Sequence, residues 1–333
     1  MRHFLSILVL ISLILLSSCS KRSDFTVAYL NPSEDRVRFV NEGRFMGERF
    51  AELGVNFIVR SAEDNDALQL RQGYELLDEG VDMLIIACVN GNTIAPLVRD
   101  AQRRGVRVIA YNRLINNSDY DLFITGNNQQ IAQIFCDEAL RLKPTGNYIV
   151  LGGDRFDRNG LELKQHIDSI LAPHIESGRI NLIYSTFVEN WSGTRAKFEL
   201  QQILESHGTD IDAVIACSDP MGVGAIELLS EYGLEGDVVV TGQDAILEAV
   251  RQVYNGNMTV TVYHPHRALG YRVADLAFEM LNGERSSRLA NWETFNGFVE
   301  IPTYRMNSVA ITRQSIEEEL INVGQYTWNQ IRN

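Results

Sequence analysis

The chain has 333 residues, of which 45% are hydrophobic and 22% are charged, which is the composition of a globular protein with a sizeable core. Its 30 basic and 43 acidic side chains leave a net charge of -13. This acidic balance excludes a nucleic acid as partner, because binding a phosphate backbone requires clustered positive charge. At about 100–200 residues per domain, the length indicates two domains or two similar halves.

The first residues have the pattern of an export signal. A short basic start precedes an apolar run from Phe4 to Leu16, which is shorter than the ~20 residues that span a membrane. The run ends in Leu16-Ser17-Ser18-Cys19, which resembles the bacterial lipobox. We therefore expect residues 1–18 to be a lipoprotein signal peptide and residues 19–24 to be a lipidated Cys19 with a short tether. The alternative is a plain secretory signal with an incidental cysteine.

Three other cysteines, Cys88, Cys136 and Cys217, lie in apolar or helical patterns. Because an odd number cannot be fully paired and a large exported domain does not need disulfides, we expect buried free thiols. The sequence has no Cys-x-x-Cys and no His-x-x-x-His spacing. We therefore expect no metal site and no cofactor.

Short runs rich in Val, Ile and Tyr recur along the chain, and each is typical of a buried strand. They span residues 25–31, 56–61, 83–89, 107–113 and 121–126 in the first half, and 147–152, 180–186, 213–217, 238–242 and 258–263 in the second. Amphipathic stretches between them, such as 39–53, 67–77 and 94–103, predict helices. This alternation predicts an α/β fold with two similar doubly wound parallel-sheet lobes.

In such sheets a ligand binds beyond the carboxyl ends of the strands, so the polar residues at those ends are the candidate site. They are Asn31, Asn90, Asn112, Arg113, Asp157, Asp219, Gln243, Asp244 and His264, with Phe39, Tyr111, Phe187, Trp191 and Tyr263 nearby in sequence. Carboxylates accept hydrogen bonds, arginine and amide groups donate them, and aromatic rings can support the C–H face of a sugar. This set suits a neutral polyhydroxyl ligand.

Several of these residues have structural alternatives. Asp219 and Asp244 could cap the helices that follow them, and Arg113 could form a structural salt bridge. Trp191 could be a packing residue, and His264 could belong to a hinge or to the edge of a cleft.

Enzyme classes fit the sequence less well. The first strand is followed by Asn31-Pro32-Ser33-Glu34-Asp35 rather than Gly-x-Gly-x-x-Gly, and Gly-x-Ser-x-Gly does not occur. A glycoside-processing enzyme remains a remote alternative because Asp157, Asp219 and Asp244 are all predicted strand-end carboxylates. We expect their neighbouring amides and arginines to keep these carboxylates ionised, which disfavours an acid catalyst. We therefore expect no catalytic residues.

Several short segments together carry a family resemblance. They are Leu53–Ala62, Val108–Asn116, Gly146-Asn147-Tyr148, Gly152-Gly153 with Asp157–Asn159, Gly242-Gln243-Asp244, Thr261–Pro265, Asn296-Gly297 and Ile301-Pro302. From about Phe25 onward, the chain resembles the periplasmic sugar-binding proteins of ABC importers, the type I group, and most closely the D-xylose-binding members.

The resemblance implies two lobes joined by a three-segment hinge. Lobe I would comprise residues 25–125 and 264–295, and lobe II residues 126–263 and 296–333. The implied ligand residues are Arg38 and Phe39 from the first strand-end loop, Asn112, Arg113, Asp157, Asn159, Trp191, Ser218, Asp219, Asp244 and His264.

Three of these positions depart from the family pattern, which has Trp where this chain has Phe39, Asn where it has Ser218 and Lys where it has His264. The resemblance therefore implies a monosaccharide more firmly than xylose itself. We expect a monomeric lipoprotein on the periplasmic or outer cell-surface side of a bacterial membrane, delivering a D-xylose-like pentose or hexose to an ABC importer permease. A lipid-anchored sensor that signals to a histidine kinase is the alternative.

Overall fold

The computed structural model describes residues 25–333, so the predicted signal peptide, Cys19 and the tether lie outside the described residues. The chain divides into two compact units. Unit 1 runs up to Ile124 and resumes over His266–Tyr304, and unit 2 comprises Thr125–Pro265 and Arg305–Asn333. The backbone therefore passes from one unit to the other three times. Within residues 25–333 no helix is both long and apolar enough to cross a membrane.

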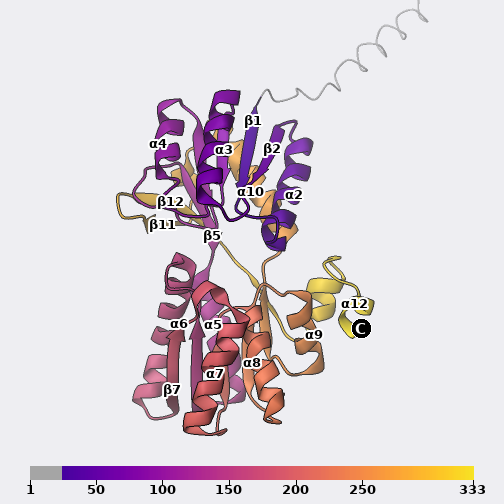
Figure 1. The fold of residues 1–333 in the computed structure, drawn as a ribbon. Coiled ribbons are helices and arrows are strands. Elements are labelled where there is room, and N and C mark those ends of the chain that lie inside the picture. The colour runs from indigo at the N-terminus through magenta and orange to yellow at the C-terminus, as the bar shows by residue number, and fades with distance from the viewer. Residues whose placement is uncertain (1–24) are drawn as a thin grey trace, which may run out of the picture. The chain divides into compact units, whose positions relative to one another are not determined.

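Unit 1 is built on a seven-stranded sheet with the strand order β11-β12-β5-β4-β3-β1-β2 (Figure 1). Its strands are β1 (Thr26–Asn31), β2 (Asn56–Ser61), β3 (Met83–Ile86), β4 (Arg107–Tyr111), β5 (Leu122–Gly126), β11 (Trp292–Phe295) and β12 (Glu300–Met306). The first five strands pair in parallel, whereas β11 and β12 pair antiparallel. Strands β1, β3 and β4 are almost entirely buried, as expected for parallel strands covered on both faces.

The helices of unit 1 cover both faces of this sheet. They are α2 (Val37–Glu52), α3 (Asp66–Glu79), α4 (Ala95–Arg103), α10 (His266–Leu281) and the short α11 (Ser286–Leu289). Helix α2 packs against α10, and α3 packs against α4, and Figure 1 shows the two pairs on either side of the sheet. Leu76 of α3, Leu97 of α4 and Leu84 of β3 belong to one buried core.

Unit 2 is built on a six-stranded sheet with the order β13-β10-β9-β8-β6-β7. Its strands are β6 (Gly146–Gly152), β7 (Ile180–Phe187), β8 (Ala213–Ala216), β9 (Val239–Gln243), β10 (Val260–Tyr263) and β13 (Val309–Ile311). The neighbouring strands from β7 to β10 pair in parallel, and β13 pairs antiparallel with β10.

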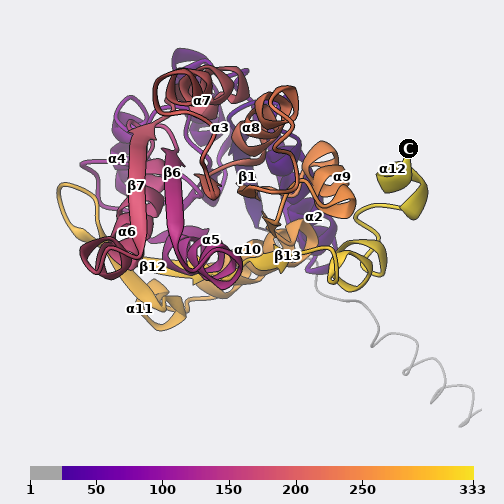
Figure 2. The same cartoon turned by 90° about the horizontal axis from the view of Figure 1, so that it is seen from below.

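Helices also cover both faces of the unit 2 sheet. They are α5 (Asn128–Leu142), α6 (Arg158–Glu176), α7 (Gly193–His207), α8 (Asp219–Glu231), α9 (Leu247–Asn255) and α12 (Trp328–Arg332), with a 3-10 turn η1 (Glu189–Trp191) and a π turn η2 (Glu317–Ile321). Helices α5 and α6 pack together, as do α7 and α8, and Figure 2 shows these pairs on opposite sides of β6 and β7. The predicted architecture of two doubly wound parallel lobes is confirmed.

The structure differs from the expected organisation near the C-terminus. Strands β11, β12 and β13 were not predicted. We expected residues 296–333 to belong to the second lobe, but residues 296–304 lie in unit 1 because β12 joins the seven-stranded sheet between β11 and β5. At the second crossing, His264 and Pro265 lie in unit 2 rather than unit 1.

Cys88, Cys136 and Cys217 are buried thiols, as predicted. Burial raises the pKa of the Cys217 thiol to about 12 and raises the pKa of Cys136 as well. Because the thiolate is the reactive form, both should resist iodoacetamide at pH ~8 in the folded protein and react after unfolding in urea. Mass spectrometry of the peptides that contain each cysteine measures this. Rapid alkylation of Cys217 before unfolding would contradict the packing described here.

Candidate functional site

Four of the predicted residues come together at the carboxyl end of the unit 1 sheet. Arg38 and Phe39 lie in the first turn of α2 rather than in the preceding loop, and Asn112 and Arg113 directly follow β4. The Nη2 atom of Arg38 donates a hydrogen bond of 3.3 Å to Asn112 Oδ1. The guanidinium carbons of Arg38 and Arg113 lie 6.0 and 5.9 Å from the centre of the Phe39 ring. The structure therefore places two cations within about 6 Å of the centre of one aromatic ring.

Glu42 was not among the predicted site residues, but it pairs with Arg38 of this cluster. Its side chain is 0% exposed, and one carboxylate oxygen accepts a hydrogen bond of 2.8 Å from Arg38 Nε. The other accepts a hydrogen bond of 2.6 Å from the Tyr111 hydroxyl. A buried carboxylate is tolerated only when it is paired in this way. Glu42 therefore fixes the direction of Arg38.

The buried tyrosines next to Glu42 stay protonated. Burial raises the pKa of Tyr111 and of Tyr29 well above the ordinary value, and the negative charge of Glu42 raises both further. A protonated Tyr111 can donate its hydrogen to Glu42. The hydrogen bonds around Glu42 should therefore persist across the physiological pH range.

Arg113 is held by the backbone of a neighbouring strand end. Its Nη1 atom donates a hydrogen bond of 3.1 Å to the carbonyl of Cys88, and the Cys88 thiol lies 3.7 Å from the carbonyl oxygens of Arg113 and Leu114. This contact of the Arg113 guanidinium is to a backbone carbonyl rather than to a carboxylate.

In unit 2, Asp157 and Asn159 lie at the start of α6, just beyond β6. Asp157 caps this helix by accepting a hydrogen bond of 2.9 Å from the Asn159 amide. The side-chain oxygen of Asn159 accepts a hydrogen bond of 3.2 Å from Asn128 Nδ2. Both residues are half-buried, so their capping and packing contacts leave part of each side chain open to solvent.

Trp191 packs on the loop after β6. A Cβ atom on Gly153 would lie 2.2 Å from Trp191 Cη2, so only glycine allows the indole ring to rest there. Trp191 itself has φ +55°, and Asn190 has φ +57°. Left-handed backbone at a bulky residue is strained and is typical of functional sites. Trp191 thus has a packing contact, as its structural alternative proposed, together with an unusual backbone.

Asp219, at the start of α8, is 0% exposed. Its Oδ1 accepts a hydrogen bond of 2.6 Å from the Thr261 hydroxyl, and its Oδ2 accepts one of 2.8 Å from the Ile246 amide. These partners lie on β10 and in the segment after β9, so the carboxylate joins other elements instead of facing solvent. We expected a direct ligand contact or a helix cap here, and the structure shows both oxygens engaged by unit 2 itself.

The pKa of Asp219 is shifted upward, although we expected its neighbours to favour the ionised form. Burial raises its pKa well above the ordinary value, hydrogen bonds from Thr261 and from the Ile246 and Ala245 amides act in the opposite direction, and the charge of Asp244 raises it. We expected neighbouring amides and arginines to favour the ionised form, whereas burial, which the sequence does not show, shifts the pKa of Asp219 upward. A fully buried acid cannot protonate a glycoside, so this shift does not favour an enzyme.

Ser218, Asp244 and His264 lie at the carboxyl ends of β8, β9 and β10. Ser218 is 3% exposed, and its hydroxyl finds no hydrogen-bond partner within the described part of the chain. One Asp244 oxygen lies 3.6 Å from His264 Nε2, and the Asp244 side chain remains 34% exposed. The other ring nitrogen of His264 shares a hydrogen bond of 2.8 Å with Ser308. Three neighbouring strand ends therefore present a hydroxyl, a carboxylate and an imidazole.

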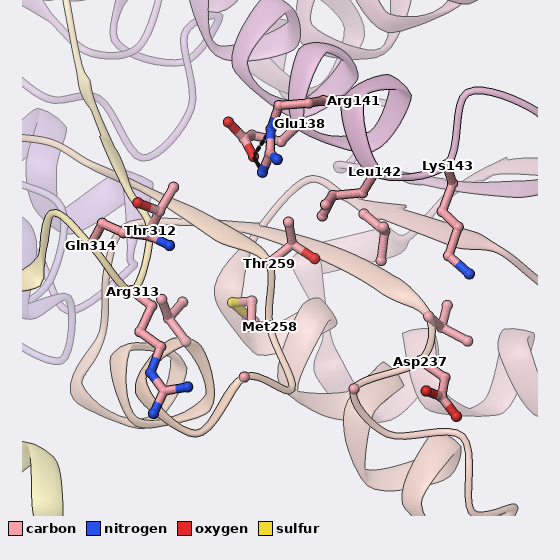
Figure 3. Close-up of a pocket in the computed structure, with 15 residues that line it drawn as sticks. Glu138, Arg141, Leu142, Lys143, Asp237, Met258, Thr259, Thr312, Arg313 and Gln314 are labelled. Atoms are coloured by element: carbon pink, nitrogen blue, oxygen red, sulfur yellow. Dashed lines mark hydrogen bonds and ion pairs between the residues drawn. The ribbon is translucent and has the colours of Figure 1, made fainter.

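A cavity of about 420 Å³ in unit 2 lies at the opposite edge of the same sheet (Figure 3). It is lined by Lys143 at the end of α5, by Asp237 and Val238 before β9 and by Thr259 before β10. These residues mark the amino ends of the strands. The cavity contains none of the predicted site residues, and Figure 3 shows its Arg141 paired with Glu138 of the same helix. Among residues 25–333 no cluster of His, Cys, Asp and Glu is arranged to hold a metal ion.

Comparison with known proteins identifies the family of this chain. Residues 27–285 match the periplasmic binding protein domain. The chain belongs to the periplasmic binding protein family. It is 32% identical to the D-xylose-binding periplasmic protein of Haemophilus influenzae over 90% of this chain and 87% of that protein. It is 31% identical to the protein of the same name from Escherichia coli over 82% of each chain.

Solved structures show the same fold. An ABC transporter solute binding protein from Clostridium phytofermentans with bound β-D-glucose aligns with a TM-score of 0.78 at 23% identity, over 92% of this chain and 99% of that one. The D-xylose relatives are named as binding proteins, which agrees with the expectation that this chain is not an enzyme.

The raised pKa of Asp219 predicts how stability depends on pH. Above about pH 4 the unfolded chain releases this proton, whereas the folded chain keeps it until the raised pKa is reached. This stabilisation is complete below about pH 4 and is lost as the pH rises, by up to ~1.4 kcal/mol per pH unit. Asp219→Asn removes this titrating group from both the folded and the unfolded chain. Urea unfolding from about pH 4 to 8 should show the free energy of unfolding of the wild type falling relative to the variant. A constant difference would contradict the shift.

Proposed function

We propose that this protein captures a monosaccharide, D-xylose or a related pentose or hexose, and delivers it to an ABC importer. Family membership and the 31–32% identity to two D-xylose-binding periplasmic proteins support this proposal. The observation that carries it is the cluster at the carboxyl end of the unit 1 sheet, where Arg38 and Arg113 both lie close to the ring of Phe39. Fixed donors beside an aromatic ring match a sugar, which has hydroxyl groups along its edge and C–H bonds on its faces.

Unit 2 supplies complementary groups. The partly exposed Asp244 carboxylate would accept two hydrogen bonds from sugar hydroxyls, and such charge-assisted bonds are the strong ones. The Ser218 hydroxyl has no hydrogen-bond partner among residues 25–333, and a sugar hydroxyl would satisfy it. Asp157, Asn159, Trp191 and His264 are the further candidate contacts of this unit.

We propose that one sugar takes contacts from both units. Three chain crossings, after Ile124, Pro265 and Tyr304, join the units and would act as the hinge. A ligand that binds groups of both units shifts the population toward the arrangement in which both sets touch it. An importer that recognises this arrangement would receive only loaded protein.

The choice among sugars depends on three positions. Phe39, Ser218 and His264 stand where the D-xylose-binding pattern has larger or more basic side chains. Because hydrogen-bonding sites reject analogues that leave buried groups unpaired, changes at these positions can alter which hydroxyl pattern is preferred. The proposed ligand class is therefore a monosaccharide, with D-xylose first in the panel to be tested.

Isothermal titration calorimetry with xylose, ribose, glucose, galactose and arabinose tests this function. One of these sugars should bind tightly, and Asp244→Asn should weaken that binding by about 10- to 100-fold because a charged acceptor is lost. Asp237→Asn is the matched control, since Asp237 is exposed at the opposite end of β9. No binding of any sugar would refute the function, and equal effects of the two variants would remove Asp244 from the site.

We also propose that the protein is exported and lipid-anchored through Cys19, and that it acts as a monomer. The support is the Leu16-Ser17-Ser18-Cys19 motif at the end of the apolar run. In a bacterial host, labelling with radioactive palmitate should mark the wild-type protein and be lost in Cys19→Ala. Label that persists in the variant would show that the protein is acylated elsewhere.

A further inference from the structure

We propose that Asp219 and Thr261 are positioning residues that set the backbone of Asp244–Ile246, and through it the direction of the Asp244 carboxylate. This inference rests on the proposed function, because it takes Asp244 as a sugar contact. It differs from the assignment of Asp219 as a ligand contact and adds Thr261, which lies inside β10 and was not a candidate.

The segment Asp244–Ile246 has a strained backbone conformation that depends on contacts with its surroundings. Asp244 has φ +101° and Ala245 has φ +48°. Positive φ at non-glycine residues is strained and persists only where surrounding contacts impose it. The contacts that impose it here can be traced to individual atoms.

Every backbone amide of this segment is held by a specific acceptor. The Asp244 amide donates to the Val262 carbonyl at 2.8 Å, the Ala245 amide to Thr261 Oγ1 at 3.2 Å, and the Ile246 amide to Asp219 Oδ2 at 2.8 Å. The Tyr326 hydroxyl donates to the Ala245 carbonyl at 3.0 Å. Two of these four bonds depend on the Asp219–Thr261 pair.

The Thr261 hydroxyl links the Asp244–Ile246 segment to Asp219. It accepts from the Ala245 amide and donates its own hydrogen to Asp219 Oδ1 at 2.6 Å. Asp219 therefore fixes the orientation of the Thr261 hydroxyl. The other oxygen of Asp219 accepts a hydrogen bond from the backbone amide of Ile246. A Cβ atom on Gly242 would lie 2.2 Å from Asp219 Oδ1, so the glycine leaves the space that this carboxylate occupies.

Burial separates the positioning residues from the contact residue. Asp219 and Thr261 are both 0% exposed, whereas the Asp244 side chain is 34% exposed. The pair therefore acts on a ligand through the segment that it holds. A carboxylate displaced by about 1 Å no longer matches the hydroxyls it must accept from, so loosening this segment should weaken binding.

Substitutions of Thr261 test the proposal, with a matched control on the neighbouring strand. Thr261→Val keeps the shape but removes the hydroxyl, and Thr261→Ser restores it. Thr241→Val removes an equally buried hydroxyl, which donates to the Ala216 carbonyl and does not contact the segment. Calorimetry with the sugar bound by the wild type should show about tenfold weaker binding for Thr261→Val. Thr261→Ser and Thr241→Val should stay within about threefold of the wild type.

Amide hydrogen exchange of the ligand-free protein gives a second readout that needs no ligand. The Ala245 and Ile246 amides should exchange faster in Thr261→Val than in the wild type or in Thr241→Val. Unchanged exchange in Thr261→Val, or equal loss of affinity in Thr261→Val and Thr241→Val, would overturn the positioning role. Faster exchange with unchanged affinity would show that the segment does not serve the ligand. If the wild type binds no sugar, the proposed function fails, and the exchange arm still decides whether the pair holds the segment.

Discussion

One fully buried carboxylate lies behind the polar residues of each unit, and the candidate site depends on both. Burying a carboxylate costs several kcal/mol unless hydrogen-bond donors surround it, so its position dictates where those donors lie. Glu42 takes its donors from Arg38 and Tyr111. Asp219 takes its donors from Thr261 and Ile246. In each unit a buried acid thus fixes the segment that carries the candidate ligand residues.

The fold determines why these residues meet at all. Parallel strands carry all their carboxyl ends to one edge of a sheet, so residues distant in sequence, such as Arg38 and Asn112, come within hydrogen-bond distance. This constraint made the strand ends predictable from the sequence, since buried parallel strands are continuous apolar runs. All ten predicted strands are present, and the residues that follow them form the unit 1 cluster and the Asp244–His264 pair.

Other features could not be predicted, for physical reasons. Strand β11 is mostly exposed and has no strong periodicity, and Pro302 within β12 argues against a strand in any sequence reading. Glu42 lies inside a helix and Thr261 inside a strand. They were not predicted because the prediction considered only residues at the carboxyl ends of strands. Glu42 left one signal, because it occupies a buried face of α2 shared with Phe39, Met46 and Phe50, where an acid must have a partner. No pattern in the sequence indicates the burial that raises the pKa of Asp219.

A crystal structure of the protein with its bound sugar would show which side chains contact the ligand. We expect one monosaccharide whose hydroxyls contact Arg113 of unit 1 and Asp244 of unit 2. Asp219 and Thr261 should contact the Asp244–Ile246 segment and should not contact the sugar. A sugar in the cavity at the amino ends of the unit 2 strands, next to Thr259 and Arg141, or one that touches only a single unit, would contradict this expectation.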